Sequence, residues 1–239
     1  MPTASPQAGW TVRPNLFSKT QRQASCAPTR QMALLKGLIA LSTVNSFACT
    51  VPHGGQSAVF GTNPIAFAAP TRSGEPIVFD MATSSMANGD VQIAASQGRQ
   101  LPPGSGVDRN GNPTTDPNEI LNGGALLPFG GHKGSYISMM IELLSAALTG
   151  GNYSFEFDWS GHPGAATPHT GQLIILINAA LAGAAPFGVR TEALISEMMS
   201  AGVTRFPGQH RFARRKASDA QGIPLTTDEL NWLEALAAD

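Results

Sequence analysis

Residues 126–135 (LLPFGGHKGS) combine three glycines, a lysine and a serine directly before an apolar segment. This pattern predicts a loop that turns into a helix. The first turn of a helix has backbone N–H groups without a partner in the helix, and it carries the positive end of the helix dipole. Glycine lets such a turn approach a ligand closely, and Lys133 adds a full positive charge. The turn is therefore either a site for a phosphate or a carboxylate, or only the start of a buried helix.

Other polar clusters give weaker chemical signals. Asp108, Asn110 and Asn112 alternate as at the start of a calcium loop, but the rest of that motif is absent, so a turn held by side chains is favoured over a metal site. We expect no metal elsewhere, because the five histidines lack metal-ligand spacing. For the basic cluster after residue 208, the residues alone favour a solvated helix face.

Several common enzyme motifs are absent from the chain. No Gly-x-Gly-x-x-Gly opens a helix after a strand, which excludes a Rossmann fingerprint. The lysine at 133 precedes Gly134 rather than following a glycine, so the phosphate loop of nucleoside triphosphatases is excluded too. Neither a Gly-x-Ser-x-Gly elbow nor a His-Glu-x-x-His helix occurs.

Composition sets broad limits on the molecule. The chain has 239 residues, of which 42% are hydrophobic and only 13% charged, which fits one large or two small globular domains. A formal net charge of -1 argues against a nucleic-acid partner, and no apolar run reaches the roughly 18 residues of a membrane span. Two cysteines, Cys26 and Cys49, give no disulfide framework and fit a reducing compartment such as the cytoplasm.

The N-terminal segment differs from the rest. No Asp or Glu occurs before Glu75, and residues 1–33 are rich in Ser, Thr, Gln, Pro and Ala without a period. Three interpretations stay open: an organelle transit peptide, a disordered tail, and a misread or truncated start ahead of a genuine domain. The missing amphipathic stripe argues against the first.

The elements that must position these residues alternate along the chain. Apolar runs predict strands at 38–44, 65–69 and 76–80, the last two as a hairpin, and a central strand at 171–177. Helical spacing predicts helices at 86–96, 135–148, 188–203 and 228–238. Ser135 is the expected N-cap of the second helix, and Glu142, its lone acid, is expected to face solvent. Residues 98–118 are expected to be irregular.

Three motifs in this order carry a resemblance. Residues 61–67 (GTNPIAF), 80–84 (DMATS) and 127–134 (LPFGGHKG) resemble the malate/L-lactate dehydrogenase family of NAD(P)-dependent oxidoreductases, over residues 34–239. Residues 88–94 (NGDVQIA) and 152–159 (NYSFEFDW) resemble its branch of delta-1-piperideine-2-carboxylate/delta-1-pyrroline-2-carboxylate reductases, which form L-pipecolate and L-proline with NADPH. The resemblance implies an α/β fold with a mixed, mostly antiparallel sheet and flanking helices, not a Rossmann fold. It also implies a homodimer.

The resemblance assigns roles to residues. The acid of a charge-relay set, which orients a proton-donating histidine, would be Asp90. The substrate would be bound by Thr62, Asn88 and Gly89. NADPH, with NADH as a possible substitute, would be bound by Asp80, Met81, Ala82, Gly131, His132, Lys133, Gln209, His210, Arg211, Arg214 and Arg215. The arginines of the last group suit the 2′-phosphate of NADPH, since guanidinium binds phosphate at two points. The family usually has an acid where Gln209 stands.

The front of the chain departs from the family. The family carries a Ser-His pair, a substrate-binding Arg and a His-Phe cofactor segment upstream, whereas residues 1–33 contain no histidine. We therefore expect a truncated or frameshifted member: a non-family segment at 1–33, an NADPH-binding domain at 34–180 and a C-terminal helical segment at 181–239. Its expected function is cyclic imino-acid reduction. The alternatives are a catalytically impaired nucleotide-binding or interaction protein, and a malate/lactate-type 2-hydroxy acid dehydrogenase.

Overall fold

The computed structural model describes residues 37–162, 169–181, 186–223, 225 and 227–238. The expectations for residues 1–33 concern residues outside this range. The chain divides into two compact units, residues 1–192 and residues 193–239. The domain boundary expected at residue 180 stays a prediction.

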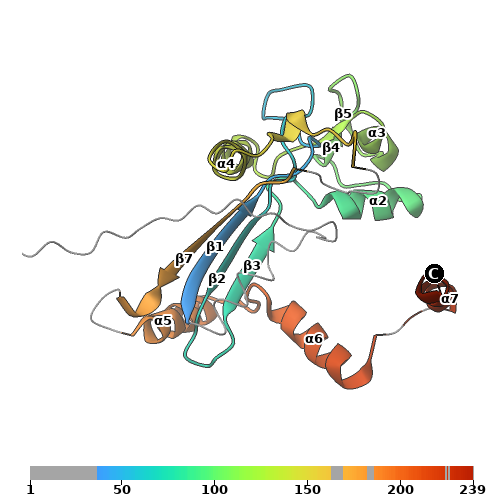
Figure 1. Cartoon of the computed structure of the whole chain (residues 1–239). Coiled ribbons are helices and arrows are strands. Elements are labelled where there is room, and N and C mark those ends of the chain that lie inside the picture. The colour runs from blue at the N-terminus through green and yellow to red at the C-terminus, as the bar shows by residue number, and fades with distance from the viewer. Residues whose placement is uncertain (1–36, 163–168, 182–185, 224, 226, 239) are drawn as a thin grey trace, which may run out of the picture. The chain divides into compact units, whose positions relative to one another are not determined.

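The first unit is built on a four-stranded antiparallel sheet of order β3-β2-β1-β7 (Figure 1). Its strands are β1 (Leu38–Val44), β2 (Ile65–Ala69), β3 (Ile77–Met81) and β7 (Gln172–Asn178). β2 and β3 form the predicted hairpin, and β1 lies between β2 and β7. The α/β fold with an antiparallel sheet is therefore confirmed. The prediction of a central strand at 171–177 was wrong, because within the described residues β7 pairs only with β1 and lies at the sheet edge.

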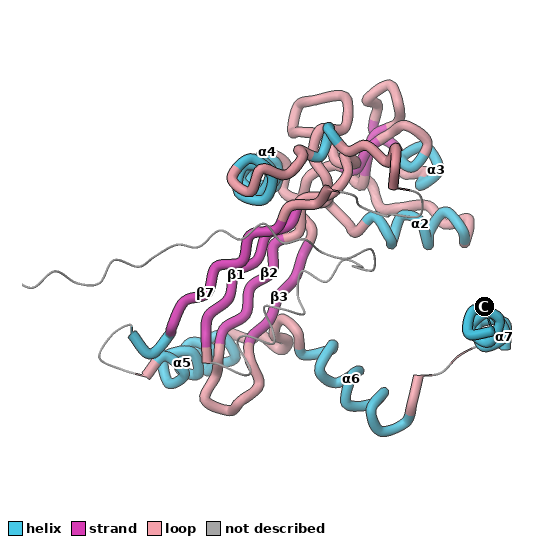
Figure 2. The backbone as a smooth tube through the Cα atoms, viewed as in Figure 1, coloured by secondary structure: helices cyan, strands magenta, loops and turns pink. Residues whose placement is uncertain are grey.

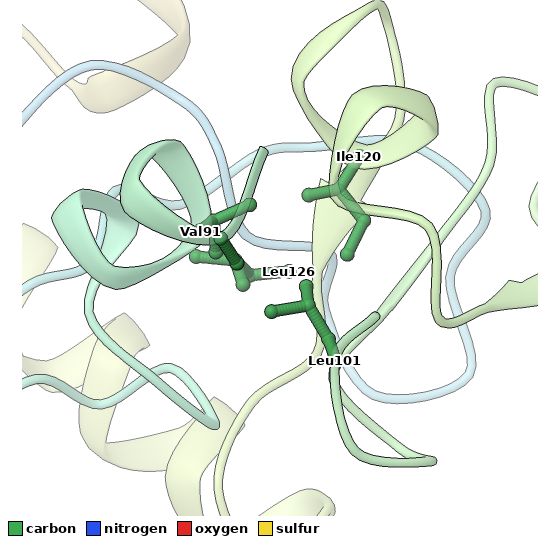
Figure 3. Packing of buried hydrophobic residues seen from close by; sticks show 5 residues of the cluster. Val91, Leu101, Ile120 and Leu126 are labelled. Atoms are coloured by element: carbon green, nitrogen blue, oxygen red, sulfur yellow. The ribbon is translucent and has the colours of Figure 1, made fainter. Parts of the chain in front are cut away.

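A second, smaller sheet of order β5-β4-β6 lies at one end of the large sheet, surrounded mostly by loops (Figure 2). It contains β4 (Gly106–Val107), β5 (Pro113–Thr114) and β6 (Ala125–Leu126), next to the helices α2 (Asn88–Ser96) and α3 (Pro117–Leu121). The segment expected to be irregular thus contains two short strands and the start of a helix. Figure 3 shows the apolar side chains that join α2 to this sheet, which include Val91, Leu101, Ile120 and Leu126.

The helix α4 (His132–Glu142) lies at the same end of the sheet (Figure 1) and continues into a π-helical turn, η1 (Leu143–Ala147). It begins three residues before the predicted start. Ser135 is not its N-cap: Gly131 occupies that position with φ of 62°, a left-handed conformation that glycine adopts without strain. Ser135 instead lies inside the helix and accepts a hydrogen bond from the His53 N–H, at 3.1 Å.

The buried face of α4 is mostly polar, although it includes the fully buried Ile141. Ser135, Ser138, Glu142 and Ser145 follow one another at helical spacing and are all buried. The side chains on the outer face include those of Tyr136, Met139, Met140 and Leu143, and all four are exposed. The helix itself was predicted, but the predicted solvent-facing position of Glu142 was wrong.

The remaining elements are helical. They are the 3₁₀ turns η2 (Ser154–Glu156) and η3 (Ala179–Leu181), and the helices α5 (Phe187–Ser200), α6 (Gln209–Gln221) and α7 (Thr227–Ala238). α5 and α7 agree with the prediction within three residues, and α6 contains the basic cluster. No helix in the described ranges is long and apolar enough to cross a membrane.

Candidate functional site

The structure joins the first two sequence motifs through Thr83. The Thr83 N–H donates to the carbonyl of Thr62 at 2.8 Å, and its hydroxyl lies 3.1 Å from the carbonyls of both Thr62 and Asn63. Thr83 is fully buried and lies two residues after the end of β3. The chain therefore leaves β3 in contact with the turn that precedes β2.

The third motif attaches to the same point. The Phe129 N–H donates to the Thr83 carbonyl at 3.0 Å, and the Ser85 N–H donates to the Leu127 carbonyl at 2.7 Å. Gly134 packs so closely on Phe129 and Thr83 that an added Cβ would lie 2.9 Å from Phe129 N and 3.0 Å from Thr83 O. Residues 127–134 thus lie against residues 83–85, and the start of α4 is fixed there.

A buried polar network continues from this junction along α4. The Ser138 hydroxyl donates to Thr83 Oγ1 at 2.7 Å, and Asn63 Nδ2 lies 3.3 Å from the Ser138 carbonyl and 2.7 Å from Glu142 Oε1. Asn63 adopts a φ of 38°, and its Oδ1 is buried with no partner among the described residues. All three motifs therefore meet at one set of hydrogen bonds in the interior.

The first turn of α4 carries positive charge but few free amides. His132 and Lys133 are exposed, and no acidic residue occurs in this turn. The N–H groups of Lys133, Gly134 and Ser135 already bond to carbonyls of the preceding loop. Attraction of an anion to this turn would therefore depend on the Lys133 ammonium and the helix dipole more than on unpaired N–H groups.

A comparison with family models identifies the group to which this geometry belongs. The model of malate/L-lactate dehydrogenase matches residues 18–234. The chain belongs to the malate/L-lactate dehydrogenase family. This match confirms the resemblance of the three motifs, and it begins 16 residues before the segment in which the resemblance was traced.

Curated relatives within this family are reductases of cyclic imino acids. The chain is 61% identical over 201 residues to a Delta(1)-pyrroline-2-carboxylate/Delta(1)-piperideine-2-carboxylate reductase of Pseudomonas putida. It is 58% identical over 202 residues to the reductase of the same name from Pseudomonas syringae pv. tomato. These matches cover 84% of this chain but 59% of each relative, so the chain spans about three fifths of the length of the relatives.

Solved structures of the family share the fold. The crystal structure of delta1-piperideine-2-carboxylate reductase from Pseudomonas syringae superimposes with a TM-score of 0.83 at 56% identity, over 87% of this chain and 63% of that chain. Sulfolactate dehydrogenase from Methanocaldococcus jannaschii gives a TM-score of 0.73 at 30% identity, over 87% of this chain and 61% of that one. The same fold therefore occurs among dehydrogenases whose names give different substrates.

The residues that the family resemblance selects lie at the junction or beside it. Thr62 takes part in it directly, while Asp80, Met81 and Ala82 precede Thr83 at the end of β3 and Gly131, His132 and Lys133 open α4. Asn88, Gly89 and Asp90 form the first turn of α2, four residues after the Ser84–Pro128 pairing, and Asp90 is exposed. The roles of these residues stay predictions.

The second unit contains the remaining predicted cofactor residues. Gln209, His210, Arg211, Arg214 and Arg215 all lie in the first two turns of α6, which begins after Gly208 in a left-handed conformation. Arg214 and Arg215 are exposed, and Arg215 forms a long ion pair of 3.9 Å with Asp219 one turn later. Within α6 the side chains of Arg214 and Arg215 are therefore accessible to an anionic ligand.

Sequence reasoning missed the buried polar residues that hold the junction. Glu142 and Ser138 lie on α4, Asn45 follows β1, and Ser154 begins η2. A signal for two of them was present: Ser135, Ser138, Glu142 and Ser145 repeat at intervals of three and four residues. Such a repeat places the polar side chains together on one face of the helix. Only contacts with other segments decide whether that face is buried.

Proposed function

We propose that the protein to which this chain belongs reduces cyclic imino acids with NADPH, converting delta-1-piperideine-2-carboxylate to L-pipecolate and delta-1-pyrroline-2-carboxylate to L-proline. The observation that carries the proposal is the 61% identity to a reductase with these substrates in its name. The junction supports it, because the three motifs that carry the family resemblance meet at one set of hydrogen bonds in this chain.

The described residues fit one phosphate of a dinucleotide at the start of α4. The turn offers an exposed ammonium at Lys133, an exposed imidazole at His132 and the positive helix end, with no acid in the first turn to oppose an anion. We propose that His132, Lys133 and Gly131 bind the cofactor from this side. Asp80, Met81 and Ala82 would line it from the end of β3.

The chemistry divides between cofactor and chain. When bound, NADPH would supply a hydride for reduction of the imine carbon. The chain would hold the imino acid beside Thr62, Asn88 and Gly89, and positioning of this kind lowers a reaction barrier by several kcal/mol. The imine nitrogen also takes a proton. The family resemblance assigns its delivery to an upstream histidine, which Asp90 would orient.

Two observations favour a weaker activity for this chain. No hydrogen bond in the described ranges joins Asp90 to a histidine, and the chain spans 59% of the length of its curated relatives. Without a general acid, hydride transfer slows by about 100- to 10,000-fold. The second candidate function is therefore nucleotide binding with little or no turnover.

The direct test uses the purified full chain. NADPH binding is measured by titration calorimetry, and NADPH oxidation is followed with each cyclic imine and with 2-oxo acids. Reductase function predicts binding and imine-dependent oxidation, with 2-oxo acids reduced more slowly. Binding without turnover would support the second candidate, faster reduction of 2-oxo acids would support a 2-hydroxy acid dehydrogenase, and no binding would contradict all three.

Two sets of variants test the proposed cofactor residues. Lys133→Ala is expected to weaken NADPH binding about tenfold through loss of a charge-assisted contact, whereas Arg99→Ala, which removes another exposed cation, is expected to leave it unchanged. The double variant R214A/R215A is expected to weaken NADPH by about tenfold or more but not NADH, which lacks the 2′-phosphate. Equal losses for both dinucleotides would contradict a 2′-phosphate contact.

We further propose a cytoplasmic homodimer. The exposed apolar face of α4, with Tyr136 64%, Met139 49% and Leu143 52% exposed, supports a partner surface. Sedimentation analysis of the wild type should give a dimer, and the variant M139E/L143E should shift it toward monomer. A wild type that sediments as a monomer would contradict the proposal.

A further inference from the structure

Glu142 is a buried carboxylate without a cation. It is 4% exposed, at the last position of α4, and no ion pair in the described ranges includes it. Burying a charge is costly unless hydrogen bonds replace the lost water. The surroundings of Glu142 must therefore satisfy it by other means.

Neutral donors from three separate segments converge on this carboxylate. Asn63 Nδ2 donates at 2.7 Å, Asn45 Nδ2 at 3.4 Å and the Ser154 N–H at 3.1 Å, and the Ser154 hydroxyl makes a further short contact. An ionised carboxylate accepts about four hydrogen bonds and donates none, so the set of donors matches it. Three loops far apart in the sequence are thus held by one side chain.

The bond to Asn63 fixes which way the Asn63 amide faces. Because Glu142 accepts, Nδ2 must face it, and Oδ1 must point the other way, toward Gly61. An added Cβ at Gly61 would lie 2.7 Å from this Oδ1, so only glycine leaves room for it. The carboxylate therefore sets the conformation of residues 61–63, including the Thr62 carbonyl that Thr83 binds.

We propose that Glu142 is a positioning residue for the substrate site, acting through Asn63 on Thr62 and through Thr62 on Thr83. It does not touch substrate or cofactor. The part of this inference that concerns substrate rests on the proposed reductase function. The part that concerns the conformation of residues 61–63 rests on the hydrogen bonds alone.

The test compares Glu142→Gln with Glu75→Gln in the full chain, well below the melting temperature. Gln keeps the shape of Glu but places an NH₂ group among donors, whereas Glu75 is exposed at the tip of the β2–β3 hairpin. Glu142→Gln is expected to raise KM for the cyclic imine at least tenfold, with kcat within threefold. Hydrogen exchange of the Thr83 amide should accelerate at least tenfold while that of β1 is unchanged. Glu75→Gln should alter neither.

The two readouts separate the two proposals. If the wild type does not reduce imines, the reductase proposal fails, and exchange at Thr83 still decides whether Glu142 positions this turn. If the wild type is active and Glu142→Gln leaves KM and exchange unchanged, the inference is overturned and the reductase proposal stands. Should Glu142→Gln not fold, Ser154→Ala removes a single donor and is expected to accelerate Thr83 exchange at least threefold; unchanged exchange there would overturn the inference as well.

Discussion

At the scale of single residues, close backbone approach decides which side chains the junction tolerates. Gly134 is the tightest case, because an added methyl group would collide with main-chain atoms of Phe129 and Thr83, which cannot move as a flexible side chain does. Gly89, at the start of α2, has no atom within 4 Å of an added Cβ. Both glycines lie in helices, so the effects of Gly→Ala substitution at the two positions can be compared directly.

Gly134→Ala is expected to destabilise the protein by about 1–3 kcal/mol, the usual cost of overpacking. Gly89→Ala is expected to stabilise it by about 0.5 kcal/mol, since alanine restricts the unfolded chain without a clash. Urea denaturation of both variants measures the free energy of unfolding. A neutral Gly134→Ala would show that the start of α4 is not anchored to Thr83.

Cys49 supplies a second prediction at this scale. Burial raises the pKa of its thiol from 9.0 to about 11, against weaker opposing effects of hydrogen bonds from Thr50 and Thr62. In a Cys26→Ser background, alkylation of Cys49 at pH 8 should be about tenfold or more slower in the native than in the unfolded protein. Equal rates would contradict the burial of this thiol.

The same shift predicts how stability depends on pH. Below pH 9 the thiol is protonated in both states. Above it, the unfolded chain releases this proton first, because its thiol keeps the lower pKa. The free energy of unfolding should therefore fall as pH rises from 9 to about 11, and a Cys49→Ala variant should lack this part of the decline.

At the scale of elements, hydrophobic patterning predicted where strands and long helices occur but not how they face. The runs at 38–44, 65–69 and 76–80 are strands within one residue, because continuous apolar residues and flanking turn residues both mark them. α4 was found from its spacing, yet of its large apolar residues only Ile141 is buried, whereas its serines are buried. Periodicity identifies the two faces of a helix. Which face is buried depends on hydrogen-bond donors from other segments, and for α4 these donors are Asn45, Asn63 and Ser154.

The two-residue strands β4, β5 and β6 could not be predicted, since they are too short to show a period. The turn between β4 and β5 was predicted better. Asp108 Oδ1 accepts from the N–H groups of Asn110 at 2.8 Å and Asn112 at 2.9 Å, which confirms a turn held by side chains. Short-range hydrogen bonding of this kind is readable from residue types alone.

Asp108 also gives a pH prediction for this hairpin. The hydrogen bond from the Asn112 N–H is the largest of several that lower the pKa of Asp108 below 3.8. Its stabilising effect is therefore present above pH 3.8 and fades as pH falls through the lowered value. The variant Asp108→Asn keeps an acceptor oxygen without the charge. The difference in denaturation midpoint between wild type and variant should shrink below pH 4, and a constant difference would contradict this effect.

At the scale of the whole molecule, burial is confined to the first unit. Every buried side chain in the described ranges lies at or before Thr191, and the junction of the three motifs lies entirely within this unit. The apolar side chains of α7 include Trp232 and Leu236, which are 61% and 55% exposed. The sequence predicted a terminal helix at 228–238, but local pattern cannot tell whether its apolar side chains are covered.

Removal of residues 203–239 is therefore expected to change stability little. Hydrophobic stabilisation scales with the apolar area removed from water, and the described residues of this segment bury no side chain. The free energy of unfolding should fall by less than about 1 kcal/mol, and the urea m-value should stay within error, because m follows the surface exposed on unfolding. Circular dichroism and tryptophan fluorescence would follow both chains through the transition. A large drop in m would contradict this prediction.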